Sequence, residues 1–343
     1  MVKARSALVL QGGGALGAFE LGVARRLYQD PDFAPDLIAG VSIGAITAAL
    51  LARPAKGLTS LQALERFWQA VAVSGWFLPP PLRPYASLLG NPAFYVPRYD
   101  FYDLARWTNI YDTAPLRATL AQLLDLDALA DTSAKPGLLV TATDIEAGEI
   151  EEFHSGETPL TLDHILASGS LPPSFPMTVI GAKSYWDGGL FDNTPLGAIL
   201  DRLGEADQRT VYVINLFPNK APVPTTFSQV AERTQNLQFC NKTAQDLKLL
   251  RRFDEVANLM EALEGLAADH PVHEDAHFKK AYAAVKARGY VRVPHIVTIT
   301  RTEQVEDFGG SDFSPQTIAR RAREGEDEAS KVLGKFKAVS AAA

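Results

Sequence analysis

The stretch Gly40-Val41-Ser42-Ile43-Gly44 decides the fold that we expect for this chain. The short apolar run 37–39 precedes it and predicts a buried strand, and residues 45–52 follow with a composition typical of a helix. A serine in a G-x-S-x-G pattern between a strand and a helix is typical of a nucleophile held on a sharp turn. Glycine flanks such a turn because the backbones approach closely and leave no room for a Cβ. We therefore expect Ser42 Oγ to stand above a sheet, beside helix N–H groups that can stabilise an oxyanion.

A second glycine-rich turn, Gly12-Gly13-Gly14, lies between a predicted strand over 6–11 and a predicted helix over 15–28. Consecutive glycines expose backbone N–H groups, which suit either a phosphate or the oxyanion of a tetrahedral intermediate. With Gly17 the loop also satisfies the dinucleotide pattern G-x-G-x-x-G, which needs an acidic residue at the end of the next strand. Asp36 lies at the start of that strand instead, which disfavours a dinucleotide. A tight turn without any ligand is the structural alternative.

The candidate base is Asp187, in Asp187-Gly188-Gly189 after a predicted strand over 183–186. A serine hydroxyl needs an adjacent base to become nucleophilic, and a carboxylate can serve when partial desolvation raises its pKa. The two glycines leave the carboxylate uncovered, although Asp-Gly-Gly is also a common hairpin turn. Asp144 and Asp192 are the rival carboxylates.

Taken in this order, the three glycine motifs resemble those of the patatin-like phospholipases. Two further segments are similar to that family, the Ser/Pro/Phe block 167–176 and the stretch 140–144 followed by Gly148-Glu149. The resemblance covers residues 5–217. Many members carry Arg or Lys just before the last glycine of the first loop, whereas this chain has Leu16. That departure weakens any attraction of an anionic headgroup to the loop and leaves the backbone donors unchanged.

The resemblance implies hydrolysis of lipid carboxylic esters through an acyl-enzyme, with Ser42 as nucleophile, Asp187 as general base and no catalytic histidine. It implies no metal and no organic cofactor. The implied oxyanion-hole residues are Gly12, Gly13, Gly14 and Ile43. The implied glycines of the elbow and the motifs are Gly17, Gly40, Gly44, Gly188 and Gly189.

Two other functions remain open from the sequence. One is an esterase of the α/β-hydrolase type with a Ser42-Asp-His295 triad, which has the right chain order but too few strands before its serine. The other is a non-catalytic lipid- or nucleotide-binding module that uses the loop Gly12–Gly17. The spacing of His270, His273 and His277 resembles a metal site, but Pro271 interrupts any helix there and disfavours it.

Composition limits the remaining possibilities. The chain has 343 residues, 47% hydrophobic content, a net charge of −7 and one cysteine, Cys240. The negative charge gives no electrostatic support for a nucleic-acid partner, and a lone cysteine fits a reducing compartment. The apolar run 7–10 is too short for a signal peptide, and the uncharged run 37–52 contains the elbow and is better explained by a buried strand and helix. We expect a cytoplasmic protein whose membrane contact is at most peripheral, and the sequence does not fix its oligomeric state.

Strands alternating with helices predict an α/β fold with a mainly parallel central sheet between helices, as three layers. We expect an acyl-hydrolase domain over 5–217, a mostly helical C-terminal extension or cap over 218–337, and a loose tail over 338–343. Thr194-Pro195 is a good helix start, with Thr as N-cap and Pro in the first turn.

The other predicted elements are more routine. We expect helices over 43–53, 59–73, 114–124, 161–169, 227–268 (broken near Arg252) and 315–337, and strands over 36–41, 137–145, 149–154, 177–180, 210–216 and 295–300. The aromatic and proline-rich segment 75–102 is either a lid or acyl-chain entrance, which could also enter a lipid interface, or a rigid loop packed on the core.

Overall fold

One mixed, mostly parallel sheet organises the computed structural model, which describes residues 6–31, 33–100, 105–202, 210–240, 275–286, 295–302 and 309–342 and scattered positions between 245 and 263. Its strand order is β10-β9-β1-β2-β5-β8-β7, and β6 also pairs with β5. The strands are β1 (Ser6–Leu10), β2 (Pro35–Gly40), β5 (Gly137–Asp144), β6 (Glu149–His154), β7 (Thr178–Ile180), β8 (Lys183–Asp187), β9 (Thr210–Asn215) and β10 (Ile296–Thr300). The expected fold class is confirmed.

The register of the central strands brings the two glycine motifs together. Strands β10, β9, β1, β2 and β5 are parallel neighbours, and Leu10 at the end of β1 pairs with Gly40 at the end of β2. The loops that follow these two strands therefore leave the same edge of the sheet side by side. Strand β8 runs antiparallel to β5, with Asp187 opposite Ala142, so its last residue joins this region from another direction.

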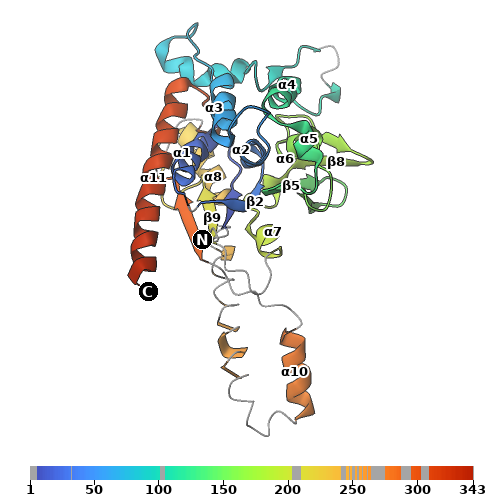
Figure 1. The fold of residues 1–343 in the computed structure, drawn as a ribbon. Coiled ribbons are helices and arrows are strands. Elements are labelled where there is room, and N and C mark those ends of the chain that lie inside the picture. The colour runs from blue at the N-terminus through green and yellow to red at the C-terminus, as the bar shows by residue number, and fades with distance from the viewer. Residues whose placement is uncertain are drawn as a thin grey trace.

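Helices cover both faces of the sheet (Figure 1). Along β1, Leu8 and Leu10 point into the larger core, while Ala7 and Val9 point into a smaller core formed with α7. This alternation is the period-2 pattern of a strand that is buried on both faces. The helices are α1 (Ala18–Tyr28), α2 (Ile43–Ala52), α3 (Ser60–Ala70), α4 (Ala114–Leu123), α5 (Leu126–Ala130), α6 (Leu162–Ser168), α7 (Leu196–Leu200), α8 (Phe227–Phe239), α10 (Ala276–Lys286) and α11 (Pro315–Ala342). Among the described helices, none has the length and apolar composition needed to cross a bilayer.

Short elements complete the chain. The 3-10 helices are η1 (Gly14–Gly17), η2 (Pro80–Leu89), η4 (Gly188–Leu190) and η6 (Gly309–Ser311), and a small hairpin pairs β3 (Val96–Pro97) with β4 (Tyr111–Asp112). Helix η2 and strand β3 give regular structure to part of the segment 75–102, which the sequence analysis interpreted as either a lid or a packed loop.

The C-terminal helix α11 runs along α1 on the larger core (Figure 1). The two helices approach so closely that a Cβ on Gly22 of α1 would lie 1.8 Å from the carbonyl oxygen of Ala322. A Cβ on Gly325 of α11 would likewise lie 2.1 Å from the carbonyl oxygen of Phe19. Glycine at both positions allows the backbones to touch, so α11 is built into the same core as the N-terminal elements.

The structure corrects two expected helix ends. Helix α7 begins at Leu196 with Pro195 as its N-cap, because the Thr194 hydroxyl accepts a hydrogen bond from Gln11 Nε2 at 2.9 Å instead of capping the helix. The tail expected to be loose over 338–343 is helical as far as Ala342, since its Ala-rich composition favours a helix.

Other expectations fall partly outside the described residues. Of the helix expected over 227–268, the structure describes α8 and scattered helical positions that include Arg252. His270 and His273 lie outside the described residues, and His277 lies in α10, a helix that the sequence analysis did not predict.

Candidate active site

Ser42 occupies a strained turn between β2 and α2. Its backbone has φ 56° and ψ −124°, and it is the only residue other than glycine with positive φ among those the structure describes. Such a conformation costs about 1–3 kcal/mol and persists only where the surroundings impose it. Here the surroundings are backbone atoms, because a Cβ on Gly40 would lie 2.1 Å from the carbonyl oxygen of Gly44. A Cβ on Gly44 would lie 2.5 Å from the carbonyl oxygen of Leu10, so both elbow glycines are required by packing.

Ser168, at the end of α6, holds the elbow from the other side. The backbone N–H of Ser42 donates to the carbonyl oxygen of Ser168 at 3.1 Å and to its hydroxyl at 3.0 Å. Ser168 is fully buried. The Ser42 N–H is thus used to fix the turn, whereas Ile43 begins α2 and its N–H has no partner within the helix. Sequence reasoning included Ser168 only within a block of family resemblance and missed this contact.

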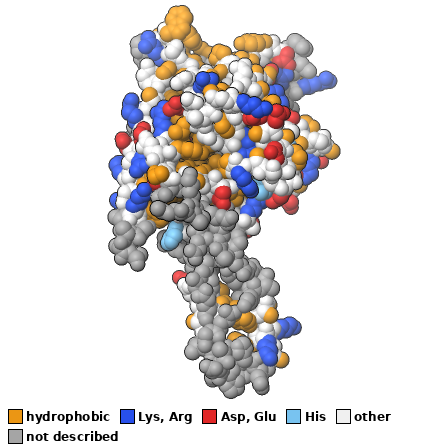
Figure 2. Space-filling model, viewed as in Figure 1, with side chains coloured by type: hydrophobic (Ala, Val, Ile, Leu, Met, Phe, Trp, Pro, Cys, Tyr) orange, Lys and Arg blue, Asp and Glu red, His pale blue; other side chains and the backbone are white. Residues whose placement is uncertain are grey.

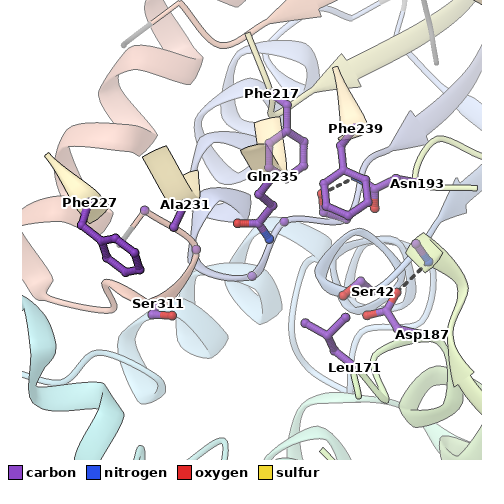
Figure 3. A pocket seen from close by; sticks show the side chains of 16 residues that line it. Ser42, Leu171, Asp187, Asn193, Phe217, Phe227, Ala231, Gln235, Phe239 and Ser311 are labelled. Atoms are coloured by element: carbon purple, nitrogen blue, oxygen red, sulfur yellow. Dashed lines mark hydrogen bonds between the residues drawn. The ribbon is translucent and has the colours of Figure 1, made fainter. Parts of the chain in front are cut away.

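Asp187 ends β8 directly beside Ser42 (Figure 3). Its carboxylate is 2% exposed and accepts a hydrogen bond from the Gly189 N–H at 2.8 Å. Burial raises the pKa of Asp187 to about 6, and the hydrogen bonds from Ser42 and from the Gly189 N–H oppose this rise. A carboxylate with this pKa is largely ionised at neutral pH and is still basic enough to accept a proton from a hydroxyl.

The two rival carboxylates have other partners. Asp144 accepts hydrogen bonds from the N–H groups of Glu146 and Ala147 and pairs with Lys183 at 3.1 Å, and these contacts lower its pKa. Asp192 accepts a hydrogen bond from the Thr194 N–H at 3.0 Å. Of the three carboxylates, Asp187 lines the cavity that contains Ser42.

Asn193 joins the Asp187 turn to the glycine loop. Its Nδ2 donates to the carbonyl oxygen of Gly12 at 3.0 Å, and the Gly12 N–H donates to the carbonyl oxygen of Asn193 at 3.4 Å. Side-chain atoms of Asn193 also fill the space where a Cβ on Gly12 or Gly189 would lie. The Gly12 N–H is therefore turned to Asn193, so that the candidate oxyanion donors of the expected set are reduced to Gly13, Gly14 and Ile43.

Gln11, the buried residue before the glycine loop, fixes the position of that loop through hydrogen bonds. Its Oε1 accepts a hydrogen bond from the Leu216 N–H at 2.6 Å, and its Nε2 donates to Thr194 Oγ1. One side chain thus links the ends of β1 and β9 to the residue after Asn193. No sequence pattern indicated this role, because glutamine before a glycine loop is an ordinary residue.

The segment before α11 forms one wall of the glycine loop. Gly14 has φ +56°, and a Cβ there would lie 2.5 Å from the carbonyl oxygen of Gly310 in η6. The buried Arg321 of α11 fixes η6, because its guanidinium donates to the carbonyl oxygen of Gly309 at 2.7 Å and of Asp312 at 3.3 Å. The C-terminal helix therefore positions the glycine loop through backbone contacts.

Two cavities meet at Ser42. The first, which we call the Asp187 cavity, has a volume of about 290 Å³ and is also lined by Gly13, Asn193 and residues of α8. In Figure 3, Phe217, Gln235 and Phe239 face Ser42, Asp187 and Leu171 across this space. The second, which we call the aromatic cavity, has a volume of about 260 Å³. It is lined mainly by apolar side chains, among them Ile43, Ile46, Phe94, Tyr95, Tyr111, Leu116, Phe175 and Phe313.

The structure brings a strained serine, a buried carboxylate and a glycine loop together at one edge of a mixed sheet. A comparison of the sequence with models of protein families agrees with this arrangement. The family model described as patatin-like phospholipase matches residues 8–200, which is more than half of the chain. The chain belongs to the patatin-like phospholipase family. Membership supports a hydrolase of lipid esters and a part in lipid degradation.

No curated protein matches the chain. Among solved structures, a match is the crystal structure of VipD from Legionella pneumophila, at 15% sequence identity and a TM-score of 0.38, over 97% of this chain and 67% of that one.

The geometry of this patatin-like phospholipase excludes the triad with His295. His295 directly precedes β10, whose first residue pairs with Val211 near the start of β9. Ser42 follows the opposite, carboxyl ends of the parallel strands, and five strand residues span about 16 Å. The ring of His295 packs against Phe336 instead.

The position at which many family members have a cation is apolar here. Leu16 is buried in the larger core. It therefore contributes packing, and no charge, beside the glycine loop.

Proposed function

We propose that this patatin-like phospholipase hydrolyses carboxylic esters of lipids through an acyl-enzyme on Ser42, with Asp187 as general base. The observation that carries the proposal is that Ser42 lies beside the fully buried carboxylate of Asp187, whose pKa is raised to about 6, in one cavity. Neither histidine nor metal is needed for the proton transfers, because one carboxylate at this pKa can both take and return a proton near neutral pH.

In the first half-reaction, Ser42 Oγ attacks the ester carbonyl carbon while its proton passes to Asp187. The carbonyl oxygen becomes an oxyanion, which the N–H groups of Gly13, Gly14 and Ile43 can stabilise. Each well-placed donor of this kind contributes about 10²–10³ in rate. Collapse of the intermediate breaks the bond to the alcohol, which leaves with the proton from Asp187, and an acyl ester on Ser42 remains.

In the second half-reaction, water attacks the acyl ester and gives its proton to Asp187. Collapse of this intermediate breaks the bond between the acyl group and Ser42 Oγ, which recovers the proton from Asp187. The carboxylic acid product leaves, and both residues return to their starting states.

The two cavities give the substrate a direction. The leaving alcohol must lie on the side of Asp187 because it receives that proton, which assigns the alcohol portion to the Asp187 cavity. The acyl chain then extends to the other side of Ser42, into the aromatic cavity. Apolar and aromatic lining suits a hydrocarbon chain because its burial removes apolar surface from water. The alcohol side has Asn193, Gln235 and Ser311, which can hydrogen-bond a polar headgroup.

The test is covalent labelling with a fluorophosphonate, mapped by mass spectrometry. We expect one adduct, on Ser42, which is absent from Ser42→Ala and from protein denatured beforehand. Ser174→Ala is the matched control, because Ser174 lines the other cavity at Ser42 and has no proposed role in catalysis, so its loss should leave labelling intact. A folded protein that is not labelled at Ser42 would contradict the proposal and favour the binding module, which thermal stabilisation by a nucleotide or lipid would then reveal.

A further inference from the structure

Large apolar side chains are exposed on the segment that links α3 to α4. Trp76 is 78% exposed and Tyr99 is 75% exposed. We call the exposed apolar side chains of this region the apolar platform: Trp76, Phe77, Leu82, Leu88, Leu89, Tyr99 and Ile110. Figure 2 shows hydrophobic side chains gathered at the top of the molecule, over the cyan segment at the top of Figure 1. A group of this size on one surface marks an interaction site rather than scattered surface residues.

The backbone of the apolar platform is fixed to the core. Asn91 is fully buried, and its Nδ2 donates to the carbonyl oxygen of Val71 at the end of α3, at 2.8 Å. The buried Ser87 hydroxyl donates to the carbonyl oxygen of Ser311 in η6, and the Tyr111 hydroxyl donates to that of Leu88 at 3.0 Å. The backbone around Leu88 and Leu89 is therefore tethered to the core, and the exposed rings of Trp76 and Phe77 pack edge to face with their centroids 6.1 Å apart.

The apolar platform is continuous with the aromatic cavity. Leu88 is 41% exposed and Ile110 is 47% exposed, and both also line that cavity. Phe94 and Tyr95, from the same segment, are buried and form part of the cavity wall. One segment thus provides the outer surface, the mouth and the wall of the space that leads to Ser42.

The charged residues near the apolar platform indicate which kind of partner fits this surface. Between Gly75 and Ile110, the range of the apolar platform, the charged residues are Arg83, Arg98, Arg106, Asp100 and Asp103, a net charge of +1, although the chain as a whole has a net charge of −7. Arg83 is exposed beside Leu82, and Arg98 pairs with Asp100 and lies over the ring of Trp107 at 4.9 Å. Trp and Tyr beside Arg are typical of the bilayer interface. Two copies joined through this surface would bring like charges together, which is unfavourable.

We propose that the apolar platform docks on a lipid bilayer, with Trp76 and Phe77 in the interface and Arg83 at the phosphate level. In this orientation the mouth at Leu88 and Ile110 faces the acyl layer, so that an acyl chain enters the aromatic cavity without crossing water. The direction of the acyl chain rests on the proposed function, whereas docking itself does not.

The experiment is co-flotation of the full-length protein with vesicles of phosphatidylcholine, with and without phosphatidylglycerol. We expect Trp76→Ala/Phe77→Ala to weaken vesicle binding at least about ten-fold, because two large aromatic surfaces are lost from the interface. Hydrolysis of vesicle phospholipid should fall in parallel, and hydrolysis of a monomeric short-chain ester such as p-nitrophenyl butyrate should stay within about two-fold of the wild type. The matched control is Leu126→Ala/Val179→Ala, which removes two other exposed apolar side chains and should change neither readout.

Arg83→Gln tests the nature of the partner. We expect roughly five-fold weaker binding to vesicles with phosphatidylglycerol and no change on phosphatidylcholine alone. Ser42→Ala should bind vesicles like the wild type but should not hydrolyse them. If wild-type protein floats through the platform but shows no hydrolysis, docking stands and the proposed function fails.

Two results would overturn docking. One is equal vesicle binding by the wild type and the double variant. The other is a wild-type dimer in light scattering that the double variant converts to a monomer, without binding to either vesicle, which would make the platform an interface between copies.

Discussion

The two halves of the proposed dyad are built in different ways. Ser42 lies in a turn whose own glycines, Gly40 and Gly44, pack against each other, although Leu10 and Ser168 from other segments also contact this turn. Asp187 is held by residues from distant segments: its N–H donates to the carbonyl oxygen of Ser170, and its carbonyl oxygen accepts from Thr143 Oγ1 at 2.9 Å. The contrast teaches that the nucleophile can be recognised from a short pattern, whereas the base is fixed by the finished fold.

The largest expected effect comes from removing the base. Asp187→Asn should lower kcat/KM by about 10⁴-fold, because the amide cannot accept the Ser42 proton. The measurement is steady-state hydrolysis of a p-nitrophenyl ester. Asp144→Asn and Asp192→Asn are matched controls and should retain wild-type rates. Full activity of Asp187→Asn would show that Asp187 is not the general base and that Ser42 and Asp187 do not form a dyad.

Of the two halves of the dyad, the turn around Ser42 should be the one that is sensitive to added side-chain volume. Gly40→Ala should lower the free energy of unfolding by about 3 kcal/mol or more, because its Cβ would lie 2.1 Å from a backbone oxygen. Gly197→Ala is the control: Gly197 lies exposed in α7 with open space around its Cβ position, so alanine should stabilise the protein by about 0.5–1 kcal/mol. Urea unfolding measures both, and equal stabilities would show that the elbow tolerates side chains.

The buried carboxylate should reduce stability where it is ionised. Its pKa is raised from 3.8 to about 6 in the folded protein, so folding favours the protonated form. This contribution to the free energy of unfolding, about 3 kcal/mol, is fully present below pH 4 and is lost as the pH rises through 6. Asp187→Asn should therefore unfold at a higher temperature than the wild type at pH 7, with little difference at pH 4. Calorimetry at the two pH values measures this, and a lower unfolding temperature for the variant at pH 7 would contradict it.

Asn193 should behave as a positioning residue between the two halves. Asn193→Ala removes the hydrogen bond to Gly12 and loosens the glycine loop relative to Asp187. We expect kcat to fall about 10–100-fold, because small displacements of reacting groups have costs of this size, with KM within about two-fold of wild type. The labelling rate of Ser42 by a fluorophosphonate should fall in parallel. A change confined to KM would place Asn193 in substrate binding instead.

The smallest effect is on the pH profile. Because Asp187 must be ionised to act as a base, kcat/KM should fall about ten-fold per pH unit below 6. Rates at pH 5 and pH 7 in one buffer system measure it. An unchanged rate at pH 5 would mean that the base ionises at a lower pH than its burial indicates.

The sequence predicted those parts of the fold that are coded locally. The strand, elbow and helix around Ser42, the glycine loop and the Asp187 turn each lie within a few consecutive residues, where strand and helix patterns and glycine are informative. Their order along the chain then identified the family, which the match over 8–200 confirms.

The supporting residues could not be found in this way. Ser168 contacts Ser42 across 126 positions of sequence, Asn193 contacts Gly12 across 181, and Gln11 contacts Thr194 across 183. No local pattern encodes such pairs, since each residue type is ordinary for its own neighbourhood. The same cause misplaced the start of α7, because Thr194 was expected to cap a helix and instead serves a distant side chain.

The aromatic segment shows a different limit. Composition could not show which aromatic side chains of segment 75–102 pack on the core and which are exposed, and the structure separates the two groups. Phe94 and Tyr95 are buried, whereas Trp76 and Phe77 are exposed.

The contact between η6 and the glycine loop has a consequence for biosynthesis. Gly14 leaves the ribosome early, and Gly310, whose carbonyl oxygen closes its outer side, follows only about 300 residues later, which takes roughly 15–60 s at typical rates of elongation. Arg321 and the α1–α11 contact, which hold η6 in place, follow later still. A nascent chain thus carries its serine and its carboxylate long before the loop beside them is enclosed. On the proposed function, we therefore expect esterase activity to appear only once η6 and α11 have been made.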